Sequence, residues 1–141
     1  MADEITSVTL LGNQGDPIEV TVADAGALAK GTVMKLSSSP QTCAITGAAN
    51  DIFMGITKEE KTANDGTVKI ALLTHFIGDF TCGAGETMVL GAPVMTGAAP
   101  NEVDVEVTDT VEGRAHIVGI ALETVGNNGV GAVLVNVGKR V

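Results

Sequence analysis

The sequence predicts an all-β protein built as one small barrel or sandwich. Apolar and polar residues alternate with a period of two along several short runs, which is the pattern of a half-buried β-strand. These runs recur at a spacing of roughly ten residues and are separated by Gly- and Asn-rich turns, as in small barrels and sandwiches. The 141 residues include 18 Gly, no Trp and no Tyr, so the predicted core is aliphatic.

The chain divides into an N-terminal arm, residues 1–15, and a single β domain, residues 16–141. The apolar positions of the arm are Ile5, Val8, Leu10 and Leu11, and a Gly-rich turn follows them. One interpretation is an arm that adds a strand to the sheet edge of another chain, because an open edge accepts strands. The other is a first strand of the domain's own sheet, and the residues favour neither.

Residues 51–80 predict a central hairpin. Two runs rich in Ile, Val, Leu, Phe and Thr flank a polar segment that ends in Asn-Asp-Gly at residues 64–66. These three residue types adopt the positive φ of a tight turn at low cost. The turn is therefore specified locally, and the runs on either side of it are expected to pair.

The strand after this turn is expected to lie in the core. Val68, Ile70 and Leu72 alternate with polar or small residues, which predicts that these three side chains are buried. Residues 72–80 are almost all apolar, and this predicts a strand that is covered on both faces.

The remaining strands are predicted from the same alternation. The Ala-rich segment 23–30 is expected to form a helical turn or a loop. Pro93 argues against a central strand position that needs an amide donor, because proline has none. The predicted strands are residues 16–22, 31–36, 42–46, 103–108, 115–122 and 130–137.

The two halves of the sequence resemble each other. Three motifs recur in the same order, each roughly sixty residues further on. This predicts a duplicated β unit whose two copies together close one barrel or sandwich, since two copies are too few for a solenoid. The matched segments are 32–34 with 93–95, 52–56 with 116–120, and 64–66 with 127–129.

The composition limits the partners. A formal net charge of -9 disfavours nucleic acid and anionic membranes and favours a basic or neutral protein surface. The N-terminus is acidic where a secretory signal is basic, and no apolar stretch has the length of a membrane span, so we expect synthesis in the cytoplasm. Cys43 and Cys82 are interpreted as buried free thiols, with a single disulfide between them as the alternative.

The reactive side chains form no recognisable catalytic, cofactor or metal motif. His75 and His116 lie in apolar strand segments, where a histidine is more often packed than catalytic. A Cys–His pair of Cys43 or Cys82 with His75 has no local support. HExxH, CxxC, the dinucleotide loop and the P-loop are missing from the sequence, so we expect no enzyme, cofactor or metal. The carboxylates of interest, interpreted as solvated strand faces or turns, are Glu59, Glu60, Asp104, Glu106, Asp109 and Glu112.

At the level of motif order, the chain resembles the capsid decoration (cement) proteins of tailed bacteriophages. The motifs are Gly-Thr-Val-Met-Lys-Leu at 31–36, Ile-Phe-Met-Gly-Ile-Thr at 52–57, and the Asn-Asp-Gly turn that leads into Val-Lys-Ile-Ala-Leu-Leu at 68–73. The chain is similar to a family encoded beside the major capsid protein and to the lambda-type head decoration proteins. The resemblance covers most of residues 26–137.

The resemblance implies a β-barrel or β-tulip-like subunit that forms a homotrimer on the outer surface of the expanded head. Such a subunit bridges major capsid proteins, and its arm, here Ile5, Val8, Leu10 and Leu11, adds a strand to a capsid element. Alternatives are a receptor- or carbohydrate-binding module of the virion, a tail or baseplate subunit, and a small hydrolase using Cys82 and His75. The lack of Trp and Tyr disfavours a sugar site.

Overall fold

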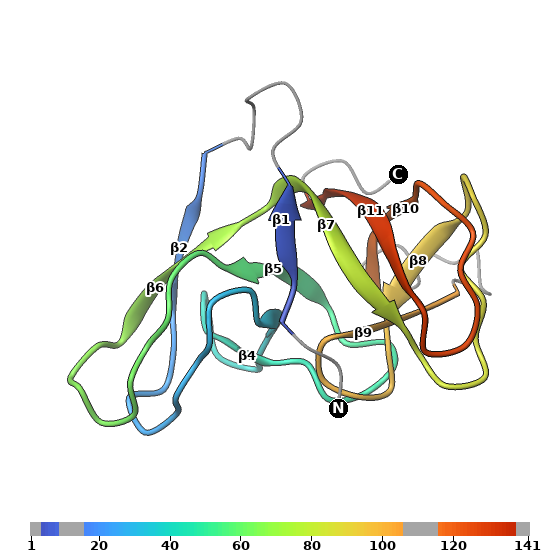
Figure 1. The fold of residues 1–141 in the computed structure, drawn as a ribbon. Coiled ribbons are helices and arrows are strands. Elements are labelled where there is room, and N and C mark those ends of the chain that lie inside the picture. Colours follow the sequence, from blue (N-terminus) through green and yellow to red (C-terminus); the bar gives the residue numbers. More distant parts are fainter. Residues whose placement is uncertain (1–3, 9–15, 106–115, 138–141) are drawn as a thin grey trace.

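The computed structural model describes residues 4–8, 16–105 and 116–137, and the described chain is all-β, as predicted (Figure 1). The strands are short and most are joined by tight turns. They are β1 (Thr6–Val8), β2 (Ile18–Thr21), β3 (Val33–Leu36), β4 (Cys43–Ile45), β5 (Phe53–Thr57), β6 (Lys69–Leu73), β7 (His75–Cys82), β8 (Pro93–Thr96), β9 (Glu102–Val105), β10 (Ile117–Ala121) and β11 (Val130–Asn136).

The strands form two sheets with the same internal order. One sheet runs β2-β6-β5-β3-β4, and the other runs β1-β7-β11-β10-β8-β9. In the second sheet β7 also pairs in parallel with β9, which closes β7, β11, β10, β8 and β9 into a five-strand barrel. In the first sheet a single parallel bridge, Thr21 to Thr42, joins β2 and β4 at the corresponding place. We call β2–β6 the first repeat and β7–β11 the second repeat.

The hydrogen-bond register shows which residues of the two repeats correspond. Met34 pairs with Gly55 in the first repeat, and Val94 pairs with Gly119 in the second. Segment 52–56 was therefore aligned correctly with 116–120, but 32–34 was aligned one residue too far along the chain. Apolar residues occur at neighbouring positions in these segments, so the sequence alone permits two alignments of the repeats. The strand register shows which of the two is correct.

The central hairpin forms as predicted, with β5 antiparallel to β6. Its turn contains Asn64 at a φ of 57° and Gly66 at a φ of 81°, and Asp65 accepts a hydrogen bond from the Thr67 amide at 2.8 Å. In the second repeat Asn128 has the same φ of 57°. Asn128 is thus the counterpart of Asn64. The predicted match of 64–66 with 127–129 paired Asn64 with Asn127 and is therefore wrong by one residue.

The apolar run 72–80 was predicted as one strand covered on both faces, and this prediction is wrong. The chain leaves the first sheet after Leu73 and enters the second sheet at His75, so the run serves two sheets. Along β7 the burial alternates, with Phe76 and Phe80 inside the barrel and Asp79 exposed. Leu72 packs in the core of the first repeat, whereas Leu73, Phe76 and Phe80 belong to the cluster that fills the barrel.

Pro93 is the first residue of β8, and β8 lies between β10 and β9. The first residue of a strand tolerates proline, so the missing amide does not exclude this central position. The segment 23–30 is a loop containing a turn, not a helix. In the described part of the chain, no helix has the length and apolar character needed to cross a membrane.

Two buried clusters hold the molecule together. The interior of the first repeat contains Met34 and Leu72, among others. The second cluster fills the barrel around Phe80, and it also contains residues from the outer face of the first repeat, such as Ile56. The outer face of the first repeat therefore packs against an end of the barrel, and this packing joins the repeats.

Lys61 fixes the long turn between β5 and β6. Its side chain has no exposure, and Nζ donates to the carbonyl oxygens of Asp24, Gly26 and Thr62 at 2.7, 3.0 and 3.0 Å. The carboxylates of Asp24 and Asp65 lie 3.8 and 3.6 Å from Nζ. One ammonium group thus satisfies three carbonyls and links the 23–30 loop to the hairpin turn, because a buried charge needs such partners.

Candidate functional site

The N-terminal strand lies against the barrel. β1 pairs antiparallel with β7, with Val8 opposite Ile77. Ile5, just before β1, is 5% exposed and its amide donates to the Gly31 carbonyl at 2.8 Å. The segment around Ile5 and Val8 is thus a first strand of the molecule's own sheet, and Leu10 and Leu11 lie outside the described residues.

Two glycines make room for this strand. A Cβ at Gly31 would collide with the backbone of Ile5, and Gly31 has a φ of 84°. A Cβ at Gly78 would lie 2.7 Å from the Ile5 side chain. Ile5 reaches the core because neither position has a side chain. The sequence showed both glycines but not that they meet Ile5.

The outer edge of β1 pairs with no other described strand. The Cys82 amide donates to the Gly129 carbonyl. The backbone amides and carbonyls of even-numbered residues of β7 therefore point toward β11, and those of odd-numbered residues point toward β1. Thr6 and Val8 lie opposite the odd-numbered residues Asp79 and Ile77, so their amides and carbonyls point toward β7. The Ser7 amide and carbonyl point away from β7. Among the described strands, β1 pairs with β7 alone.

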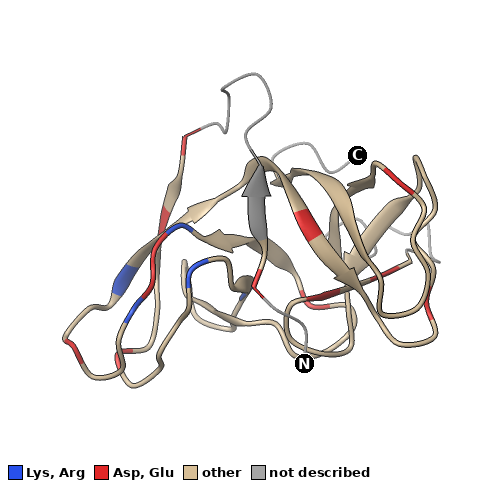
Figure 2. Cartoon of the chain, viewed as in Figure 1, with Lys and Arg blue, Asp and Glu red and all other residues tan. Residues whose placement is uncertain are grey.

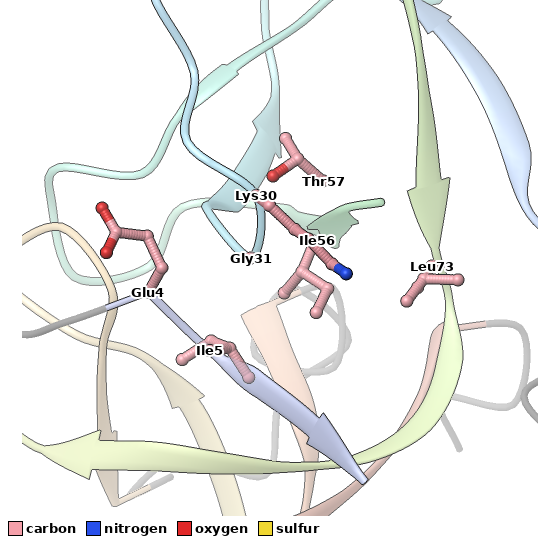
Figure 3. Close-up of a pocket in the computed structure, with 7 residues that line it drawn as sticks. All are labelled: Glu4, Ile5, Lys30, Gly31, Ile56, Thr57 and Leu73. Carbon is pink, nitrogen blue, oxygen red and sulfur yellow. The ribbon is translucent and has the colours of Figure 1, made fainter. Parts of the chain in front are cut away.

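A pocket of about 320 Å³ lies beside the start of β1 (Figure 3). The Glu4 carboxylate points away from Lys30 in this view. The Thr57 hydroxyl donates to the Ala29 carbonyl at 2.6 Å, so it already has a partner. Among the residues that line the pocket, no nucleophile lies beside a base. Its lining residues are Glu4, Ile5, Lys30, Gly31, Ile56, Thr57 and Leu73.

The structure separates Cys82 from His75, the pair considered for a small hydrolase. Cys82 and His75 lie at opposite ends of β7, about 23 Å apart at a rise of roughly 3.3 Å per residue. Cys43 lies in the other core cluster, where burial raises the pKa of its thiol to about 11. Burial also raises the pKa of Cys82, so both thiols resist forming the nucleophilic thiolate. Both are buried and free, as predicted, and His116 is half-buried just before β10.

The carboxylates highlighted in the sequence are scattered. Glu59 and Glu60 are exposed in the hairpin turn, as expected, whereas Glu106, Asp109 and Glu112 lie outside the described residues. The described residues contain no group of acidic, His or Cys side chains that could hold a metal ion.

Asp104 departs from the prediction of a solvated strand face. Its Oδ1 is buried with no hydrogen-bond partner among the described residues, next to Gly83. Burial is the main cause that raises the pKa of this carboxyl group, and the charges of Glu86 and Glu102 add to the effect. At neutral pH this carboxylate is therefore a destabilising charge.

We expect Asp104→Asn to raise stability at pH 7. The folded protein binds the Asp104 proton more tightly than the unfolded chain does, so wild type loses stability as the pH rises from the ordinary value of 3.8 through the raised folded-state pKa. Below pH 3.8 the gain should vanish, because the carboxyl group is then protonated in both states. Urea unfolding of both proteins across this range measures the difference. An equal gain at every pH would show that charge is not its cause.

The described positive charges lie in the first repeat (Figure 2). In the described part of the second repeat, the charged residues at neutral pH are carboxylates. The described part of the second repeat is therefore acidic, and Arg114, Lys139 and Arg140 lie outside the described residues. The described lysines are Lys30, Lys35, Lys58, Lys61 and Lys69.

The sequence matches no protein-family model, and it matches no curated protein closely enough to indicate a relative. A function must therefore be supported by the chemistry and geometry of the described residues.

Proposed function

We propose that this protein is a capsid decoration (cement) protein of a tailed bacteriophage. In this proposal it is made in the host cytoplasm, forms a homotrimer, and binds the outer surface of the assembled head, where it bridges major capsid proteins. The observation that supports the proposal best is the outer edge of β1, where the Ser7 amide and carbonyl point away from β7 and no described strand pairs with them, because strand addition uses such an edge.

The reactive residues support a binding role over a chemical one. Burial raises the pKa of both thiols, and the length of β7 separates Cys82 from His75. The pocket beside β1 offers an ammonium and a carboxylate but no nucleophile with a base. A protein with these properties acts through its surfaces.

A cement protein needs only modest affinity at each contact. Binding that is specific to the assembled shell stabilises that shell by mass action, and the effect multiplies over many copies. Strand addition at β1 supplies backbone hydrogen bonds and a fixed register, whereas side-chain contacts supply specificity. The acidic character of the described part of the second repeat favours a basic or neutral capsid surface and disfavours DNA or anionic lipid as the direct partner.

The proposal is tested by mixing the protein with expanded, undecorated heads and measuring the bound protein by sedimentation. We expect saturable binding at a fixed number of copies per head. Ser7→Pro should weaken binding by roughly tenfold or more, because proline removes the outward amide but leaves the bonds of Thr6 and Val8 to β7.

The matched control is Ser7→Ala, which keeps the amide and should bind like wild type. Circular dichroism confirms that both variants are folded. If wild type fails to bind the heads at micromolar concentration, the decoration role is wrong. If Ser7→Pro binds as well as Ser7→Ala, the attachment does not use the outer edge of β1.

A further inference from the structure

The two repeats carry the same apolar row on the outer face of their sheets, but the row is buried in one repeat only. In the first repeat the three positions are 0%, 1% and 5% exposed. In the second repeat Ile120 is 47% exposed, Pro93 is exposed and Leu134 is half-buried. The rows are Val33, Ile56 and Leu73 in the first repeat, and Pro93, Ile120 and Leu134 in the second.

The barrel covers the row of the first repeat. The end of the barrel that covers it includes Val118 and Thr96, and both are almost fully buried. The Val33 amide donates to Oδ1 of Asn101 at 2.9 Å, and the Thr96 hydroxyl donates to the Asp51 carbonyl at 2.9 Å. An outer row of one repeat therefore fits the end of the other repeat's barrel.

The same end of the first repeat is uncovered. Leu36 and Met54, which correspond to Thr96 and Val118, are only partly buried. Ile18 and Ile52 at this end are 37% and 38% exposed. Each molecule thus has one uncovered outer row, on the second repeat, and one uncovered end, on the first repeat.

We propose that these two surfaces bind each other between copies of this chain, head to tail. The outer row of one copy's second repeat would cover the open end of the next copy's first repeat, as the first and second repeats pack within one chain. The two surfaces differ, so the interface is heterologous, and repeating it closes a ring or extends a filament. The proposed homotrimer would be one such closed ring, and this inference names the surfaces that would join its copies. The contact is formed without a shell, so it is tested independently of capsid binding.

The residues flanking the outer row support an interface. Leu90, Leu122 and Val130 are 64%, 38% and 58% exposed. Leu90 and Leu122 lie near Ile120, because the neighbouring Gly91 amide bonds to the Ala121 carbonyl. The first repeat, whose row is already covered, has lysines at the three corresponding positions, namely Lys30, Lys58 and Lys69. The residues beside the row are thus apolar in the second repeat, where the row is uncovered, and charged in the first repeat, where the row is covered.

Pro93 makes the outer row suitable for an apolar contact. In the first repeat the corresponding Val33 amide needs the Asn101 side chain as its partner. Proline has no amide, so covering Pro93 leaves no donor without a partner. Gln41, the counterpart of Asn101, shares its positive φ, at 54° against 62°, and is exposed. The contact between copies would therefore rest on apolar burial and not on a repeat of this hydrogen bond.

The test is sedimentation velocity of the full chain over a concentration series, with circular dichroism to check folding. We expect wild type to sediment as an assembly larger than a monomer. Ile120→Glu, on the outer row, and Ile52→Glu, on the open end, should each weaken assembly by roughly tenfold or more, because each buries a carboxylate in the contact. Val68→Glu changes an apolar residue that is 50% exposed and should assemble like wild type.

Mixing the two defective variants distinguishes a heterologous contact from an isologous one. Each variant retains one intact surface, so the mixture should form a dimer of one copy of each and nothing larger. A wild-type monomer at high micromolar concentration would overturn the proposal. So would assembly by either variant alone, or a mixture that stays monomeric. None of these results depends on binding to heads, so failure here is distinct from failure of the decoration role.

Discussion

Leu72→Asp is expected to abolish the cooperative folding of this protein. Leu72 is 0% exposed in β6 and faces the interior of the first repeat, where it shares a cluster with Val20 and Met34. A carboxylate there has no cation to pair with in that cluster, and burying an unpaired charge costs several kcal/mol. Thermal unfolding followed by circular dichroism should show no native transition, or one at a much lower temperature.

Val68→Asp is the matched control for this substitution. Val68 lies on the same chain segment and was also predicted to be buried, but it is 50% exposed and precedes β6. A surface substitution of this kind changes the free energy of unfolding by about 0.5 kcal/mol or less. If Val68→Asp were as damaging as Leu72→Asp, the side chain of Val68 would have to be covered.

Lys61→Met should destabilise the protein by about 3 kcal/mol, because breaking a buried charge network by removing one partner has an effect of this size. The substitution removes the donor shared by the carbonyls of Asp24, Gly26 and Thr62, because a thioether donates no hydrogen bond. The long turn should also become more open to proteolysis, since these bonds hold it to the 23–30 loop. Urea unfolding measures the first effect, and limited digestion measures the second.

The control for Lys61→Met is Lys58→Met, which removes an exposed charge from the same turn. It should unfold within about 0.5 kcal/mol of wild type. If both variants lose the same stability, the effect comes from net charge and not from the buried ammonium of Lys61.

Several features of the fold followed from the sequence because they depend on local chemistry. The alternation of apolar and polar residues predicted most of the strands, and the Asn-Asp-Gly turn predicted the β5–β6 hairpin. The repeated motifs predicted a duplicated unit, and the two repeats do share one strand order. Burial of Cys43 and Cys82 was predicted in the same way, from residue type and neighbours.

The candidate site was only partly predictable. The apolar pattern around Ile5 and Val8 indicated a strand but allowed two partners for it, and only the folded chain showed the pairing with β7. The buried position of Ile5 depends on Gly31 and Gly78, which lie far from Ile5 in the sequence. Such a contact leaves no local pattern, because each glycine alone looks like an ordinary turn or strand residue.

Ile56 and Ile120 show that the sequence alone does not determine which of two equivalent residues is buried. Both are isoleucines at the same position of the same strand in two matching repeats, and their local patterns predict the same strand face. One is 1% exposed and the other 47%, because the barrel packs on the first and no described residue covers the second to the same extent. Local residue order determined the strands and the faces of this protein. Which face is buried was decided by the packing of one repeat on the other, since burial depends on what lies opposite a side chain in space.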